Sequence, residues 1–160
     1  MTELHLLRHA HAGNPARWTG DDAARPLSDK GRRQCRRLGA LLSTLDDAPD
    51  LFITSPRVRA LQTAELVAEA IGAPVVVDER LTGMLDVDTV AAIVSSAPAA
   101  ERPCLVGHDP AFSEVMADLL GVVHLPMRKG AIARVTVEGP PYLPGTAVLR
   151  YLLPPDVVPG

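Results

Sequence analysis

Short apolar runs alternate with longer amphipathic segments along most of this 160-residue chain, and this alternation limits the folds it can adopt. Short apolar runs bounded by turn residues are typical of buried strands, whereas apolar residues at helical spacing indicate helices that pack by one face. Strands that alternate with helices predict a three-layer α/β/α sandwich around a mostly parallel central sheet. The predicted strands are 4–8, 51–54, 75–77 and 104–107, and the predicted helices are 29–45, 56–71, 86–96 and 110–120.

The pattern changes toward the C-terminus, where the apolar runs 132–137 and 148–153 are separated only by the Gly- and Pro-rich residues 138–145. That connection has no room for a helix, so the two runs are expected to pair as an antiparallel hairpin. A chain of this length favours one domain. We place the domain at 1–153 and expect 154–160 to be a loose tail.

Local signals place the helix ends and one long loop. Ser28 is expected to be an N-cap, and Ser55 with Pro56 resembles an N-cap and a first helical residue. Residues 10–27 show no periodic pattern, and loops of this length often bind or cover ligands. Trp18, the only tryptophan, could cover a site or anchor this loop, and anchoring is favoured.

Composition argues against several classes of protein. A net charge of −3 and an aromatic content of 3% do not suit a nucleic-acid binder, which needs a basic excess or aromatic surfaces for stacking. The N-terminus lacks the features of a signal peptide, and no apolar run approaches the length of a membrane span, so a cytoplasmic protein with no membrane partner is expected. Cys35 and Cys104 lack paired spacing and are expected to be reduced, buried thiols.

Four arginines lie on the outer face of the first predicted helix. They could bind an acidic partner, but a solvated charged face is the favoured interpretation. These residues are Arg32, Arg33, Arg36 and Arg37.

Polar side chains follow three of the predicted strands. Arg8 and His9 end the first strand, Arg59 comes shortly after the second, and His108 follows the fourth. Since crevices in open α/β sheets form at the carboxyl ends of the strands, these side chains are expected to meet there. Two guanidiniums can bind phosphoryl oxygens through forked hydrogen bonds, and an imidazole with an unprotonated nitrogen can attack phosphorus. Such a set needs no metal ion.

A metal site is the alternative for the N-terminal histidines. His5, His9 and His11 alternate along the chain, so a strand would place them on the same face. No carboxylate at a recognisable ligand spacing completes the set. We therefore predict neither a metal nor a cofactor.

Four segments together resemble the histidine phosphatase superfamily. The first carries the Arg-His motif of that family, and the other three follow in the family's order, over about residues 4–135. The short chain and the Arg-Pro-Leu-Ser stretch are most similar to the SixA-type phosphohistidine phosphatase branch. The segments are Leu6-Leu7-Arg8-His9-Ala10, Arg25-Pro26-Leu27-Ser28-Asp29-Lys30-Gly31, Ser55-Pro56-Arg57-Val58-Arg59-Ala60-Leu61-Gln62-Thr63-Ala64 and Val106-Gly107-His108-Asp109-Pro110.

This resemblance implies a phosphoglycerate-mutase-like fold and a phosphatase that forms a covalent intermediate. His9 would be the nucleophile that is transiently phosphorylated, and water would hydrolyse the phosphoenzyme. Arg8, Arg59 and His108 would form the phosphate pocket. A hydrogen bond to the other ring nitrogen of His9 is expected to fix the ring, from a partner that the sequence does not identify.

One departure from the wider superfamily bears on the substrate. Mutase-like members usually carry a glutamate, as proton donor to an alcohol leaving group, where Arg80-Leu81-Thr82-Gly83 places glycine. An imidazole leaves phosphorus more easily than an unprotonated alkoxide, so phosphohistidine in a protein is the favoured substrate. The partner would then be a phosphorylated protein of the histidine-phosphotransfer type. Glu79, Asp86 and Asp88 are alternative proton donors.

Two other functions remain open for the same residues. One is a phosphomonoesterase that acts on small phosphorylated metabolites, such as sugar phosphates or nucleotides. The other is a non-catalytic module that binds a phosphorylated ligand; the presence of both histidines and both arginines disfavours it.

Overall fold

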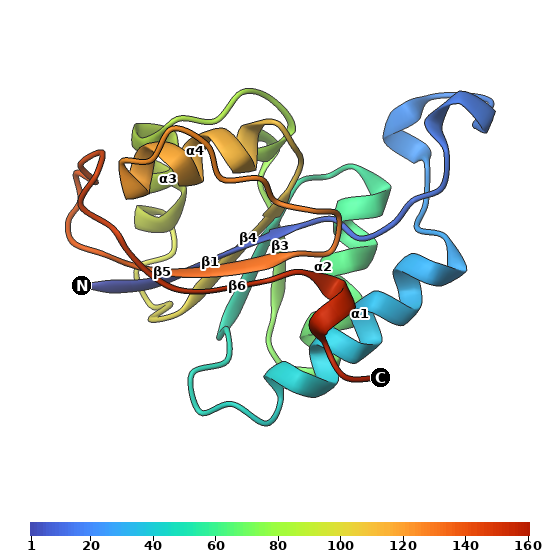
Figure 1. Ribbon diagram of the computed structural model, residues 1–160, viewed down its shortest axis with the longest axis horizontal. Coiled ribbons are helices and arrows are strands. Elements are labelled where there is room, and N and C mark those ends of the chain that lie inside the picture. The colour runs from blue at the N-terminus through green and yellow to red at the C-terminus, as the bar shows by residue number, and fades with distance from the viewer.

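A six-stranded sheet with helices on both faces forms the structure, a computed structural model that describes residues 1–160 (Figure 1). The strand order is β3-β2-β4-β1-β5-β6. The predicted α/β sandwich is therefore confirmed. The strands are β1 Thr2–Arg8, β2 Leu51–Thr54, β3 Val75–Val77, β4 Pro103–Gly107, β5 Ile132–Val137 and β6 Val148–Leu153, and the helices are α1 Asp29–Leu42, α2 Val58–Ile71, α3 Val87–Ser95 and α4 Ala111–Leu120.

The four strands β1 to β4 are parallel, and β5 and β6 are antiparallel to their neighbours. The hairpin predicted for the last two strands is confirmed. Along β4, Gly107 lies opposite Arg8 of β1 and Val106 lies opposite Thr54 of β2. The residues that follow β1, β2 and β4 therefore leave the sheet at one edge.

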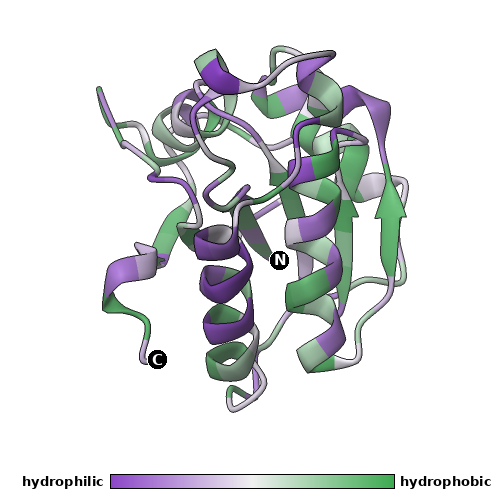
Figure 2. Cartoon of the chain, turned by 90° about the vertical axis from the view of Figure 1, so that its right-hand side faces the viewer, coloured by the Kyte–Doolittle hydropathy of each residue, from purple (hydrophilic) through white to green (hydrophobic).

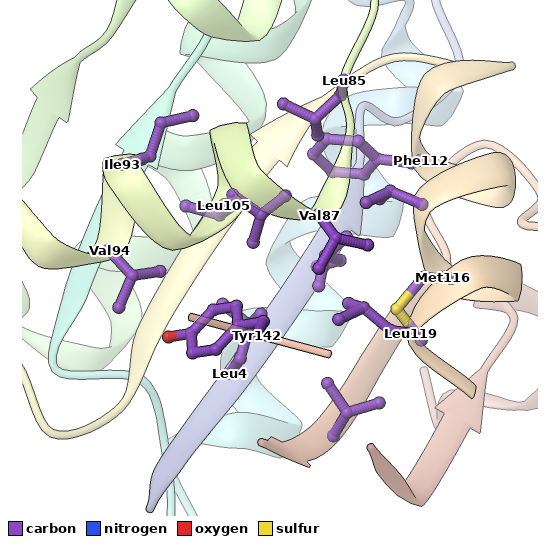
Figure 3. Close-up of a cluster of buried hydrophobic side chains, with 14 of the residues drawn as sticks. Leu4, Leu85, Val87, Ile93, Val94, Leu105, Phe112, Met116, Leu119 and Tyr142 are labelled. Carbon is purple, nitrogen blue, oxygen red and sulfur yellow. The ribbon is translucent and has the colours of Figure 1, made fainter. Parts of the chain in front are cut away.

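Two apolar cores lie on opposite faces of the sheet, because successive side chains of a strand point in opposite directions. Leu4 of β1 belongs to the core covered by α3 and α4, whereas Leu7 belongs to the core covered by α1 and α2. In the first core, Leu105 of β4 is buried together with Val87 and Phe112 (Figure 3). None of the helices is long and apolar enough to cross a membrane.

The start of α1 is packed tightly against the chain that leaves β1. The predicted N-cap is confirmed, because the Ser28 Oγ accepts a hydrogen bond from the Gly31 N–H at 3.1 Å. The Ser28 N–H donates to the His11 carbonyl at 3.0 Å. A Cβ on Gly31 would collide with that same carbonyl, so the glycine permits the close approach. The helix ends at Leu42, earlier than the predicted residue 45.

The predicted start of α2 is wrong by two residues. Ser55 and Pro56 precede the helix, which begins at Val58 with Arg57 as its N-cap. The Ser55 Oγ accepts only a long bond of 3.3 Å from the Arg57 N–H, and it also lies 2.8 Å from the His108 ring. The Ser55 side chain thus contacts His108, which follows β4, and does not cap α2.

The C-terminal residues are not a loose tail. Pro155–Val157 form a 3₁₀ turn, and Val158 is buried in the core that α1 and α2 cover. Burial of the Val158 side chain contributes about 1.5–3 kcal/mol toward holding this segment against the body of the protein.

The loop between β1 and α1 extends beyond the carboxyl edge of the sheet (Figure 1). It contains two 3₁₀ turns, Pro15–Arg17 and Asp22–Ala24. The Trp18 Nε1 donates to the Asp21 carbonyl at 2.9 Å. This bond lies within the loop, and the Trp18 side chain is exposed.

Candidate active site

The ends of β1, β2 and β4 bring three polar residues to the carboxyl edge of the sheet. The His9 N–H donates to the Gly107 carbonyl at 2.9 Å, and the Ser55 N–H donates to the Val106 carbonyl at 3.0 Å. His108 follows β4 directly, so it lies between the other two chain exits. The centroids of the His9 and His108 rings are 5.3 Å apart, with an angle of 53° between the ring planes.

A glycine allows α4 to pack against the end of β4 just before His108. A Cβ on Gly107 would lie 2.8 Å from ring atoms of Phe112. Phe112 is the second residue of α4 and is fully buried. The small residue therefore lets the apolar helix cover the strand end while the next residue turns into the site.

His9 is held in a single tautomer. The residue is 5% exposed, and its Nδ1 lies 2.8 Å from the Ala10 carbonyl oxygen. A carbonyl oxygen can only accept a hydrogen bond, so Nδ1 carries the proton and Nε2 keeps its lone pair. Burial, with further contributions from His108 and Arg59, lowers the pKa of His9 to about 3. The ring is therefore neutral at pH 7 and able to act as a nucleophile.

Thr63 of α2 positions the carbonyl that fixes the His9 ring. The Ala10 N–H donates to the Thr63 Oγ1 at 3.1 Å, and that hydroxyl donates to the Arg59 carbonyl at 2.7 Å. Thr63 is buried, so no water competes for these bonds. One hydroxyl thus ties the exit of β1 to the first turns of α2.

We expect Thr63→Val to lower the free energy of unfolding by about 1–3 kcal/mol, because valine has nearly the same shape but leaves the buried Ala10 N–H without an acceptor. The kcat should also fall, since the Ala10 peptide is then free to shift. Urea unfolding and steady-state kinetics would measure the two effects. Thr63→Ser keeps the hydroxyl and serves as the control; equal losses in the two variants would contradict this role.

Arg59 projects from the first turn of α2 and is almost completely buried, with 6% of its side chain exposed. Its Nη1 donates to the Asp22 carbonyl at 2.9 Å, and its Nη2 is 3.0 Å from the Asp22 carboxylate. Its Nε is buried and has no hydrogen-bond partner. One donor of this guanidinium is thus left without an acceptor in the protein.

Arg8 is oriented by the opposite side of the site. Its Nη1 donates to the Met127 carbonyl at 2.7 Å and is 3.3 Å from the Asp109 carboxylate. Its Nε, like that of Arg59, is buried without a partner. Arg8 is therefore positioned through Nη1 and Arg59 through both terminal nitrogens, and both residues keep Nε unpaired.

His108 completes the group of four predicted residues. Its Nε2 is 2.8 Å from the Ser55 Oγ, while its Nδ1 is buried without a partner. Burial, followed by the charges of Arg59 and Arg57, lowers the pKa of His108 to about 4. Buried nitrogens in native proteins are nearly always hydrogen-bonded, so unpaired nitrogens on three neighbouring residues suit the oxygen atoms of an anion.

Two carboxylates at this site were not predicted from the sequence. Asp22 lies on the long loop and pairs with Arg59, with Arg25 at 3.0 Å and with Arg57 at 3.9 Å. Asp109 pairs with Arg8, although in the sequence it stood out only as part of the fourth family segment. The only signal for Asp22 in the sequence is its position three residues before Arg25, which begins the second family segment.

The acidic residues considered as proton donors lie elsewhere. Glu79, Asp86 and Asp88 are exposed, and the Asp86 carboxylate caps α3 by accepting from the Thr89 N–H at 2.7 Å. No hydrogen bond or ion pair connects any of the three to the four predicted site residues.

The N-terminal histidines do not form a cluster. The His5 ring packs 6.2 Å from that of Tyr151, and the His11 Nδ1 is 2.6 Å from the Ser28 Oγ. The structure contains no group of three or more His, Cys, Asp or Glu side chains placed to hold a metal ion. Cys35 and Cys104 are buried and unpaired, and burial raises the pKa of the Cys35 thiol to about 12.

Comparison with known proteins identifies the family and agrees with the fold. The model of the histidine phosphatase superfamily (branch 1) matches residues 4–85, just over half of the chain. The protein named probable phosphoglycerate mutase GpmB of Klebsiella pneumoniae subsp. pneumoniae is 27% identical, over 89% of this chain and 88% of that protein. The transcription factor tau 55 kDa subunit of Saccharomyces cerevisiae is 29% identical over 51% of this chain, which spans only 20% of that protein.

Solved structures show the same fold over nearly the whole chain. The protein histidine phosphatase SixA complexed with tungstate has a TM-score of 0.83 at 24% identity, over 97% of this chain and 98% of that one. SixA of Nakamurella multipartitia has a TM-score of 0.77 at 26% identity, over 95% of both chains. A mycobacterial glucosyl-3-phosphoglycerate phosphatase has a TM-score of 0.71 at 19% identity, over 94% of this chain and 98% of that one. This chain therefore belongs to the histidine phosphatase superfamily, and membership supports the general activity of a phosphatase or mutase.

Proposed function

We propose that this protein is a phosphatase that works through a covalent phosphohistidine on His9, with Arg8, Arg59 and His108 binding the transferred phosphoryl group. The observation that carries the proposal is the combination of a neutral His9, whose Nε2 keeps its lone pair, with unpaired buried nitrogens on all three neighbours. A phosphoryl group offers three oxygen acceptors, which suit the two guanidinium N–H groups and also the His108 Nδ1 in the tautomer where the Ser55 hydroxyl donates to Nε2 and Nδ1 carries the proton.

The reaction has two displacements at phosphorus. The His9 Nε2 forms a bond to phosphorus as the bond from phosphorus to the substrate's leaving atom breaks, and the leaving group takes up a proton. Water then attacks the phosphoenzyme, the bond between phosphorus and Nε2 breaks, and inorganic phosphate is released. Fixed positive charge around the phosphoryl oxygens stabilises both transition states. Arg8 and Arg59 supply this charge, so we propose that the reaction needs no metal ion.

Phosphohistidine in a protein is the proposed substrate. Gly83 ends the 3₁₀ turn where mutase-like members carry their acidic proton donor, and Glu79 of the same turn is not paired with any site residue. An imidazole leaving group depends less on such an acid than an alkoxide does. The likeness to the protein histidine phosphatase SixA supports the same substrate class.

Hydrolysis of small phosphate esters is the second candidate. It is favoured by the likeness to a glucosyl-3-phosphoglycerate phosphatase. The hydrogen bond from Arg25 and the charge of Arg59 lower the pKa of Asp22, so that carboxylate stays ionised and an alcohol leaving group would take its proton from water.

A substrate panel separates the two candidates. We expect kcat/KM to be about 100-fold higher, or more, for a phosphorylated histidine-phosphotransfer protein than for sugar phosphates and nucleotides, because only the ester needs a strong proton donor. Phosphoramidate and an alkyl phosphate provide a pair of small substrates that differ in the leaving atom. Each assay is run with and without EDTA. Faster turnover of the alkyl phosphate would support the esterase, and loss of activity with EDTA would contradict the metal-free mechanism.

A further inference from the structure

A second concave surface adjoins the candidate active site and shares Arg8 with it. This groove has a volume of about 830 Å³ and is lined by α1, the loop before β5 and the C-terminal 3₁₀ turn, with no hydrophobic residue among its ten lining residues. We call it the basic groove. Its cations are Arg8, Lys30, Arg33, Arg37, Arg128 and Lys129.

The sequence of α1 places three of these cations in a row. Lys30, Arg33 and Arg37 follow helical spacing, so they lie on one face of the helix over a length of about 10 Å. Figure 2 shows α1 as a largely hydrophilic helix next to the C-terminal segment. Arg32 and Arg36 belong to the same helix but do not line the groove.

The charge of the groove is strongly one-sided. It holds six of the sixteen Lys and Arg residues of the chain and only one of the nineteen Asp and Glu residues, Asp156, in a protein whose net charge is −3. Asp156 lies 3.3 Å from Arg128. None of the other carboxylates lies within 4.0 Å of Lys30, Arg33, Arg37 or Lys129.

The groove and the active site form one electrostatic field. Burial, together with neighbouring guanidiniums of which Arg8 is the foremost, lowers the pKa of Lys129. The next residue, Gly130, donates its N–H to the Arg8 and His9 carbonyls at 3.1 and 3.0 Å, so Lys129 lies close to the phosphate-binding residues while it also lines the groove. Unpaired like charges gathered in a concavity repel one another, and an anionic ligand would remove this repulsion.

We infer that the basic groove docks an acidic surface segment of the phosphorylated protein substrate, so that its phosphoryl group reaches His9. This inference rests on the proposed function. Sites for small organic ligands are lined mainly by apolar side chains, which this groove lacks. An extended row of exposed, unpaired cations instead suits the carboxylates of a protein surface, which it would attract and orient.

The double variant Arg33→Gln/Arg37→Gln tests the groove, and Arg32→Gln/Arg36→Gln on the same helix is the matched control with equal loss of charge. For a phosphorylated histidine-phosphotransfer protein, we expect the groove variant to lower kcat/KM by about tenfold or more at low salt, and this deficit to shrink as salt is added. Turnover of phosphoramidate should stay within about twofold of the wild type, because neither arginine belongs to the phosphate pocket. The control pair should change both rates by less than about twofold.

Several outcomes would overturn the inference. One is an unchanged kcat/KM of the groove variant for the phosphorylated protein, and another is an equal loss of kcat/KM in the control variant. A third is an equal loss of kcat/KM of the groove variant for small bisphosphates, which would assign the groove to small anions. Direct binding of a fluorescent hexaglutamate peptide keeps the test independent of catalysis. If the wild type hydrolyses neither substrate, the proposed function fails, yet weaker peptide binding by the groove variant than by the control would still support an acidic docking site. Equal binding by both would overturn it.

Discussion

A His9→Asn variant is expected to lose at least about 10³-fold in phosphatase rate, because removal of a nucleophile abolishes the covalent route. Asparagine is chosen because its amide N–H can still donate to the Ala10 carbonyl, which the His9 Nδ1 reaches at 2.8 Å. The chain at the end of β1 should therefore keep its conformation. What disappears is the unprotonated ring nitrogen that would attack phosphorus.

Two measurements test this expectation. The first is steady-state release of phosphate from phosphoramidate, and the second is trapping of an alkali-stable, acid-labile phosphoenzyme after rapid mixing with labelled substrate. The trapped species should form in the wild type and be absent from the variant. His124→Asn is the control, since His124 is exposed and lies outside the site. Wild-type turnover in a clean His9→Asn preparation would exclude His9 as the nucleophile.

The meeting of Arg8, His9 and His108 at the strand ends could be predicted because strand periodicity and sheet geometry act together. Leu6 and Leu7 indicate a buried strand, and the change to Arg8 and His9 marks its end. Parallel strands then place their ends at one edge, where the structure brings His9 and His108 to a ring separation of 5.3 Å. Neither inference required a knowledge of loop conformation.

The parts that could not be predicted depend on contacts between distant segments. Ser55 and Pro56 form a good local helix start, yet the Ser55 hydroxyl lies next to His108, 53 residues away. Asp22 reaches Arg59 only through the conformation of a loop that has no periodic pattern. Val158 is buried by the packing of a segment too short to show any periodicity. Local propensity is a weak prior, and tertiary contacts override it at such positions.

An Arg59→Gln variant is expected to lower kcat/KM by about 10²–10³-fold, the usual effect of removing one fixed donor from a developing anion. The fold should tolerate the change. Although the Arg59 side chain is buried, its partner Asp22 is half-exposed and keeps an ion pair with Arg25 at 3.0 Å. Thermal unfolding should therefore shift little, while inorganic phosphate becomes a much weaker inhibitor.

A comparison with Arg57 distinguishes two possible roles of Arg59, which are to bind phosphate or to hold the loop through Asp22. Arg57 also faces the Asp22 carboxylate, at 3.9 Å, but its side chain is 36% exposed and none of its nitrogens is a buried, unpaired donor. If the unpaired Nε of Arg59 binds the phosphoryl group, Arg57→Gln should lower kcat/KM by less than about tenfold. Arg59→Lys should then recover only part of the activity that Arg59→Gln loses, because lysine keeps the charge but lacks the fork of donors. If both Gln variants lose activity equally, the common ion pair with Asp22 is the important feature. The pair of measurements thus distinguishes a phosphate ligand from an arginine that only holds the loop in place.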